Sequence, residues 1–135
     1  MKILTNGCFD ILHYGHIVYL ETCKTLVPDA HLIVAINSDA SVKKLKGLTR
    51  PLQPEAQRAH CLLALTVVDE VIIFNETRIN KLLKNIQPDV WIKGGDYTLE
   101  SLDQSERHLA ESLNIEIKFT GLIPGVSTTR ILSKL

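Results

Sequence analysis

The sequence predicts an α/β fold built on a parallel sheet, and three observations lead to this prediction. Short apolar runs alternate along the chain with helical patterns, which is the order that a parallel sheet with crossover helices requires. The clearest run, residues 31–37, is apolar between its ends and rich in branched residues, as expected for a buried parallel strand. The 135 residues show no internal repeat or linker, which favours a single domain over 1–135.

Strands are predicted where short apolar runs are bounded by turn residues. Five runs meet this description, at residues 3–5, 31–37, 71–74, 90–93 and 115–119. The last run alternates between apolar and polar residues, which is typical of a strand that is half-buried.

Helices are predicted between these strands. The first opens near residue 13, has apolar residues at Ile17, Leu20 and Cys23, and ends before Pro28. The remaining helices are expected at residues 38–45, 54–65, 79–85, 102–113 and 128–135. Capping residues and a first-turn proline support the first two of these. Together the elements predict a Rossmann-like, doubly wound, five-stranded parallel sheet with helices on both faces.

Residues 6–16 form the most informative segment, because they join the first strand to the first helix through a glycine turn. Unpaired backbone N–H groups and the positive end of the helix dipole meet at such a junction and attract anions. His13 and His16 lie on one face of the helix start, where each can donate an N–H to a phosphate oxygen. Gly7 and Gly15 let backbone and ligand approach closely. The segment therefore predicts a nucleotide site suited to phosphate chemistry.

The pattern Gly-x-Phe-Asp-x-x-His-x-Gly-His over residues 7–16 closely resembles the signature of the HxGH nucleotidyltransferases. Within that superfamily the chain is most similar to the adenylyltransferases that act on D-glycero-β-D-manno-heptose 1-phosphate. This closer resemblance rests on residues 37–42, 45–51, 93–97 and 125–129. It implies an enzyme that transfers AMP from ATP to the heptose 1-phosphate, giving pyrophosphate and ADP-heptose for lipopolysaccharide or another surface glycan.

The resemblance also implies roles for individual residues. The catalytic residues would be His13, His16 and Lys46. Contacts to the nucleotide are implied for residues of the signature turn, of the turn after the fourth strand and of the last helix, namely Gly7, Cys8, Phe9, Gly15, Gly94, Asp96, Ser127, Thr128 and Thr129. Contacts to the acceptor substrate are implied for Asp10, Lys44 and Arg58. Mg²⁺ is expected to arrive with ATP, held mainly by phosphates and water, and no metal site of the protein itself is predicted.

Some of these residues also have a structural interpretation. Asp10 could orient a histidine or a substrate group, or it could fix the turn by hydrogen bonding its own backbone. Arg58 could be an exposed arginine on a helix, and Ser127 and Thr128 could be ordinary helix caps.

Two other functions stay open. Glycerol-3-phosphate cytidylyltransferases share the signature, but they carry an arginine before the last helix that residues 122–127 lack, and they lack the Lys-Gly-Gly-Asp-Tyr form of residues 93–97. Gln57 stands where the family has an acidic residue, so the acceptor could be another sugar phosphate. The other function that stays open is that of a non-catalytic module that senses ATP. The presence of both signature histidines and of Lys46 favours the enzyme.

The composition argues against several classes of partner. Lys plus Arg number 15 and Asp plus Glu also 15, so no global positive field exists to hold nucleic acid. The apolar runs fall far short of the roughly 18–20 residues that span a bilayer, and no signal peptide is visible, so we expect a cytoplasmic protein without membrane association. The three cysteines are widely spaced and predict reduced thiols. By resemblance, a homodimer is expected.

Overall fold

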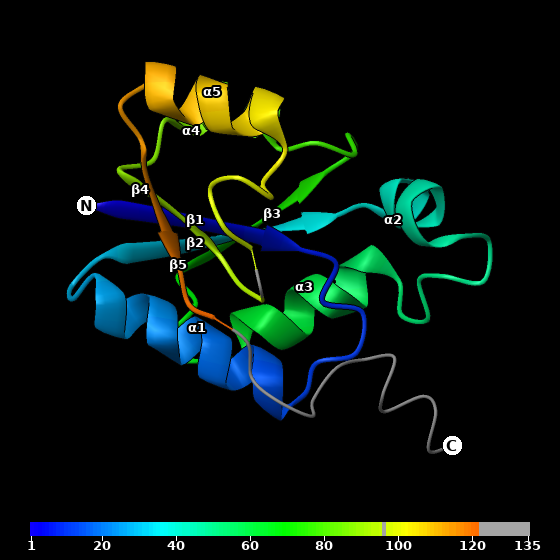
Figure 1. Cartoon of the computed structure of the whole chain (residues 1–135). Coiled ribbons are helices and arrows are strands. Elements are labelled where there is room, and N and C mark those ends of the chain that lie inside the picture. Colours follow the sequence, from blue (N-terminus) through cyan, green and yellow to red (C-terminus); the bar gives the residue numbers. More distant parts are fainter. Residues whose placement is uncertain (96, 122–135) are drawn as a thin grey trace.

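The computed structural model describes residues 1–95 and 97–121. Within them, five parallel strands form one sheet in the order β3-β2-β1-β4-β5 (Figure 1). The strands are β1 (Lys2–Gly7), β2 (His31–Asn37), β3 (Glu70–Phe74), β4 (Val90–Lys93) and β5 (Glu116–Phe119). The predicted parallel sheet of five strands is therefore confirmed.

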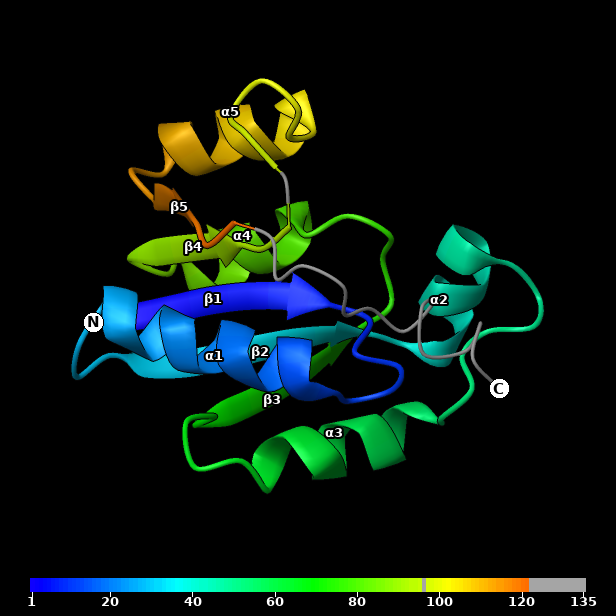
Figure 2. The ribbon, with the colours of Figure 1, turned by 60° about the horizontal axis from the view of Figure 1, so that its bottom comes forward.

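Helices cover both faces of this sheet, as predicted. They are α1 (Tyr14–Leu26), α2 (Asp39–Lys46), α3 (Glu55–Leu63), α4 (Asn80–Ile86) and α5 (Gln104–Ser112). Figures 1 and 2 show α1 and α3 on one face and α4 and α5 on the other, whereas α2 lies beyond the end of β2. The helix predicted at 128–135 lies outside the described residues.

The boundaries differ from the predictions by a few residues at strand and helix ends. β1 runs on to Gly7 because its pairing with β2 continues through Gly7↔Ile36, although Asn6 and Gly7 are not apolar. α5 begins at Gln104, after Asp103 caps it by accepting a hydrogen bond from the Glu106 amide. Hydrogen bonding to β2 sets the end of β1, and a side-chain cap sets the start of α5. Neither feature can be recognised from apolar periodicity.

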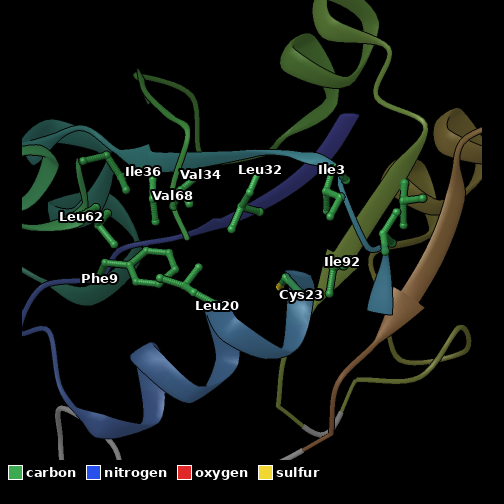
Figure 3. Packing of buried hydrophobic residues seen from close by; sticks show 13 residues of the cluster. Ile3, Phe9, Leu20, Cys23, Leu32, Val34, Ile36, Leu62, Val68 and Ile92 are labelled. Atoms are coloured by element: carbon green, nitrogen blue, oxygen red, sulfur yellow. The ribbon is translucent and has the colours of Figure 1, made fainter. Parts of the chain in front are cut away.

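Two apolar layers fill the space between the sheet and its helices. Consecutive strand residues point to opposite faces, so Ile3 packs toward α1 while Leu4 packs toward the other side. Figure 3 shows the first layer, in which Leu20 and Cys23 of α1 meet the sheet. The second layer surrounds Trp91, whose side chain is fully buried. Because β2 is covered on both faces, its apolar run lacks alternation, as the sequence indicated.

The strand order places a crevice at one edge of the sheet. The chain proceeds outward from β1 through β2 to β3, then returns to add β4 on the other side of β1 and β5 beyond it. In open parallel sheets, ligands bind beyond the carboxyl ends of the strands where the direction of winding reverses. In this chain that point lies between β1 and β4.

Across residues 1–95 and 97–121, no helix combines the length and the apolar character that crossing a membrane would require.

Candidate active site

A cavity of about 910 Å³ opens at the carboxyl edge of the sheet. Its walls come from the segments that follow β1, β2, β3, β4 and β5 in the chain, so segments far apart in sequence meet there as predicted. The predicted site residues that line it are Gly7, Cys8, Phe9, Asp10, His13, Gly15, His16, Lys46 and Gly94. The volume is in the range that holds a nucleotide-sized ligand.

His13 and His16 form a hydrogen-bonded pair at the start of α1. Nδ1 of His13 accepts a hydrogen bond from the Gly15 amide (3.1 Å), and Nδ1 of His16 accepts one from the His13 amide (3.3 Å). The two rings stack with centroids 3.8 Å apart. The arrangement is a capping box, a motif that Ser or Thr with Glu usually forms, and it satisfies two amides of the first turn.

This pairing decides which form of each histidine is present. Because both Nδ1 atoms accept hydrogen bonds, the proton of each neutral ring sits on Nε2. Burial lowers the pKa of His13, and burial together with the neighbouring His13 lowers the pKa of His16 to about 4. Near pH 7 the pair therefore offers neutral N–H donors, which suits hydrogen bonding to phosphate oxygens.

Phe9 both lines the cavity and belongs to the core. Its backbone φ is +49°, and its buried ring lies 5.0 Å from the ring of His16. A Cβ at position 7 would come within 3.0 Å of the Phe9 ring, which explains why glycine occupies that position. Phe9 was predicted to contact the nucleotide. In the structure its ring packs against the ring of His16.

Asp10 ties the signature turn to the loop between α2 and α3. Its carboxylate accepts hydrogen bonds from Arg50 Nε (2.6 Å) and from the amides of Leu52 and Gln53 (2.9 Å each). Burial alone would raise the pKa of Asp10, but these amides and the Arg50 guanidinium outweigh it and lower the pKa. Of the alternatives for Asp10, turn fixation agrees best with these contacts, although the partner is a distant loop rather than its own backbone.

The two predicted lysines occupy different surroundings. Lys46, the last residue of α2, lines the cavity, whereas Lys44 is exposed and lies outside the cavity wall. The role of Lys44 in binding the acceptor thus receives no support from the geometry. Arg50, which belongs to the motif over residues 45–51 but was given no role of its own, lines the cavity instead.

Arg58 is buried and lies outside the cavity wall, so it is not an exposed helix arginine, and the geometry gives no support to its predicted contact with the acceptor. Its guanidinium is fully buried and donates to the carbonyls of Gln53 (2.9 Å), Cys8 (2.8 Å) and Asn37 (2.8 Å). It also pairs with Asp39 at 2.9 Å. All three nitrogens are used within the protein, so Arg58 braces the loops of the site.

Tyr19 of α1 also lines the cavity, and the sequence did not predict this. Its buried hydroxyl donates to the carbonyl of Ile92 (3.0 Å) and is hydrogen bonded to Thr5, and burial raises its pKa. A Cβ at Gly94 would come within 2.8 Å of the Tyr19 ring. The Gly94 of the predicted motif is therefore required for helix α1 to approach the end of β4.

Further residues line the cavity on the side of α5, and of these only Tyr97, in the turn after β4, belongs to a segment that was expected to contact the nucleotide. Arg78, Lys93, Tyr97 and Glu106 all line the cavity. Lys93 could have been found, because it ends a predicted strand and points to the same face as Trp91 two residues earlier. Arg78 and Glu106 are single charges in a loop and a helix, which no sequence pattern distinguishes from surface residues.

Four predicted residues, Asp96, Ser127, Thr128 and Thr129, lie outside the described residues. Over the described part of the chain, no group of three or more His, Cys, Asp or Glu side chains is arranged to hold a metal ion.

Comparison with known proteins decides the family. A family model described as cytidylyltransferase-like matches residues 4–134. The chain belongs to the cytidylyltransferase-like family. Membership confirms the predicted class, a nucleotidyltransferase.

Several relatives of this family member are similar over its whole length. It is 46% identical over 133 residues to the bifunctional protein HldE of Geotalea uraniireducens (strain Rf4), covering 98% of this chain and 26% of that protein. It is 44% identical over 133 residues to the bifunctional protein HldE of Campylobacter fetus subsp. fetus, covering 98% of this chain and 27% of that protein. The chain thus spans about a quarter of the length of these curated relatives.

A solved structure agrees with the fold of this cytidylyltransferase-like chain. The crystal structure of the lipopolysaccharide core biosynthesis protein from Thermoplasma volcanium GSS1 matches with a TM-score of 0.71 and 30% identity. The match covers 91% of this chain and 96% of that one, so the two share the fold.

Proposed function

We propose that this chain is an adenylyltransferase that transfers AMP from ATP to D-glycero-β-D-manno-heptose 1-phosphate. The products are ADP-heptose and pyrophosphate. The observation that carries the proposal is the neutral histidine pair at the start of α1, aimed at a cavity that Lys46 also lines. The motif resemblance over residues 37–51 and 93–97 and the similarity to the bifunctional HldE proteins support the choice of substrates.

The reaction needs alignment and charge stabilisation more than covalent chemistry. An oxygen of the acceptor phosphate forms a bond to the α-phosphorus of ATP. The bond from that phosphorus to the α–β bridging oxygen breaks, and its electron pair leaves with pyrophosphate. His13 and His16 would donate Nε2–H hydrogen bonds to phosphate oxygens that gain charge, and Lys46 would add a positive charge on the same side.

Mg²⁺ enters this proposal as part of the substrate, bound to the triphosphate. The carboxylate of Asp10 is already used by Arg50 and by two backbone amides, so it is poorly placed to serve as a metal ligand. An ion held by phosphates and water fits this donor set.

Pyrophosphate release with purified protein and Mg²⁺ tests the proposal. ATP and CTP are each paired with heptose 1-phosphate and with glycerol 3-phosphate. We expect release with ATP and the heptose phosphate only, and a His16→Ala variant should lower turnover roughly 100- to 1000-fold. Release with CTP and glycerol 3-phosphate would instead identify a glycerol-3-phosphate cytidylyltransferase. ATP binding without release for any sugar phosphate would favour the sensor.

A further inference from the structure

Lys93 places an ammonium group in the wall of the cavity on the side of α5. Its Nζ lies 4.6 Å from the ring centroid of Tyr97 and 5.9 Å from that of Trp91. Among the described residues, these aromatic faces are its close contacts, and no carboxylate reaches salt-bridge distance. The charge is therefore held in position by rings that leave its N–H donors available to a ligand.

Keeping a charge in this place is unfavourable in the empty protein. Burial lowers the pKa of Lys93, the attraction of Glu106 opposes this effect, and the repulsion of Arg78 adds to it. A ligand that brings negative charge or several oxygen acceptors would remove this cost on binding. The site is thus prepared for an oxygen-rich ligand.

Glu106 contributes a second, opposite charge to the same wall. Its side chain is largely buried, and Oε2 accepts a hydrogen bond from the Ile79 amide (3.0 Å). That bond fixes the carboxylate and leaves Oε1 as the oxygen that can accept from a ligand hydroxyl. Tyr97, which is 44% exposed, adds an aromatic face beside Lys93.

The cavity consequently has two chemically different sides. The side of α1 and α2 carries the histidine pair, Lys46 and Arg50, which suits a triphosphate. The side of α5 carries two cations, two carboxylates and one aromatic ring, from Lys93, Arg78, Glu106, Asp103 and Tyr97, a balanced set that matches the hydroxyl groups and apolar face of a sugar rather than a polyanion.

We propose that Lys93, with Tyr97 and Glu106, forms the subsite for the sugar phosphate acceptor and that the Lys93 ammonium is its main source of affinity. The inference rests on the proposed function for the nature of the acceptor. It differs from the sequence-based expectation for the turn after β4, which was contact with the nucleotide.

The test compares wild type with Lys93→Met by titration calorimetry, in the presence of Mg²⁺ and α,β-methylene-ATP, which cannot be cleaved at the α–β bridge. Met keeps the length of the side chain and removes the charge beside the rings, so the variant should fold. We expect the Kd for heptose 1-phosphate to rise roughly 10- to 100-fold, because a charged hydrogen bond is lost. The Kd for ATP, measured separately, should stay within about twofold.

Lys84→Met is the matched control, because Lys84 is an exposed lysine of α4 outside the cavity wall, and this variant should bind both ligands like wild type. Unchanged affinity of Lys93→Met for the acceptor would overturn the inference. A loss confined to ATP would overturn it too, by assigning Lys93 to the nucleotide.

The same titrations separate this inference from the proposed function. Glycerol 3-phosphate and a hexose 1-phosphate are titrated alongside the heptose phosphate. If wild type binds a sugar phosphate that Lys93→Met binds weakly, the subsite stands even when no pyrophosphate is released. If wild type binds none of them, both proposals fail.

Discussion

The histidine pair shows how single residues in this protein serve folding and chemistry through the same atoms. Each Nδ1 satisfies an amide at the start of α1, which leaves the proton of each neutral ring on Nε2, and both residues line the cavity. A Ser–Glu capping box would satisfy the same amides but would offer no such donors. The presence of histidine at positions 13 and 16 is therefore explained only when helix capping and phosphate binding are considered together.

The lowered pKa of His16 predicts a specific dependence of stability on pH. Its pKa is about 4 in the folded chain and about 6.5 when unfolded. Between these values the unfolded chain binds a proton that the folded chain does not, so the free energy of unfolding falls as pH drops from about 6.5 to about 4. The full loss is up to roughly 3 kcal/mol.

Urea unfolding at several pH values between 7.5 and 4.5, followed by the fluorescence of Trp91, measures this slope. His16→Gln removes the titrating group and should flatten the slope. His108→Gln, which changes an exposed histidine of α5, should retain the wild-type slope. Equal slopes for His16→Gln and wild type would show that the His16 ring is not protected from protonation in the folded state.

At the scale of elements, Arg58 holds together the segments that build the site. From α3 it reaches the turn after β1, the end of β2, the start of α2 and the loop before α3 itself. The carboxylate of Asp10 likewise connects the turn after β1 to the loop between α2 and α3. The loops are thus fixed to one another by buried charges, which keeps the cavity open in a defined shape.

Removing the Arg58 guanidinium should lower the free energy of unfolding of the whole chain. Arg58→Met removes the donor to three carbonyl oxygens and the ion-pair partner of Asp39, which costs about 3–5 kcal/mol. Arg78→Met is the control, because the Arg78 side chain is 61% exposed and its pair with Asp103 is long, at 3.5 Å. That change should cost less than about 1 kcal/mol. Chemical denaturation measures both, and similar losses for the two variants would contradict the bracing role.

Sequence patterns predicted the strands and helices but not the contacts that individual side chains make. The apolar run of β2 and the glycine turn after β1 predicted both the sheet and the place of the site. The burial of Arg58 could not be predicted, because its acceptors are backbone carbonyls that carry no sequence signal. Likewise, Lys44 and Lys46 lie two residues apart on a helix, and only the three-dimensional path of α2 shows which of them reaches the cavity.

At the scale of the whole molecule, the strand order explains why one edge of the sheet carries all of the candidate chemistry. Because β1 is central, the segments after β1, β2 and β4 open side by side at the carboxyl edge, while the amino edge carries only the connections that return the chain. Binding of a nucleotide should therefore slow amide hydrogen exchange more at the carboxyl edge of the sheet than at the amino edge.

Hydrogen exchange measured by mass spectrometry, with and without Mg²⁺-ATP, can detect this difference. At an ATP concentration of about 100 times Kd, openings that release ATP should become roughly a hundredfold rarer. Amides in 8–13, 46–53 and 93–95, which adjoin the cavity, should slow accordingly. The connections at the other edge, 27–30, 64–69 and 113–115, should exchange as before, since their local openings leave the cavity intact. Mg²⁺ alone is the control and should slow neither set. Protection that is equal at both edges would mean that ATP acts on the global unfolding of the chain, and protection confined to the amino edge would place the nucleotide at a different site.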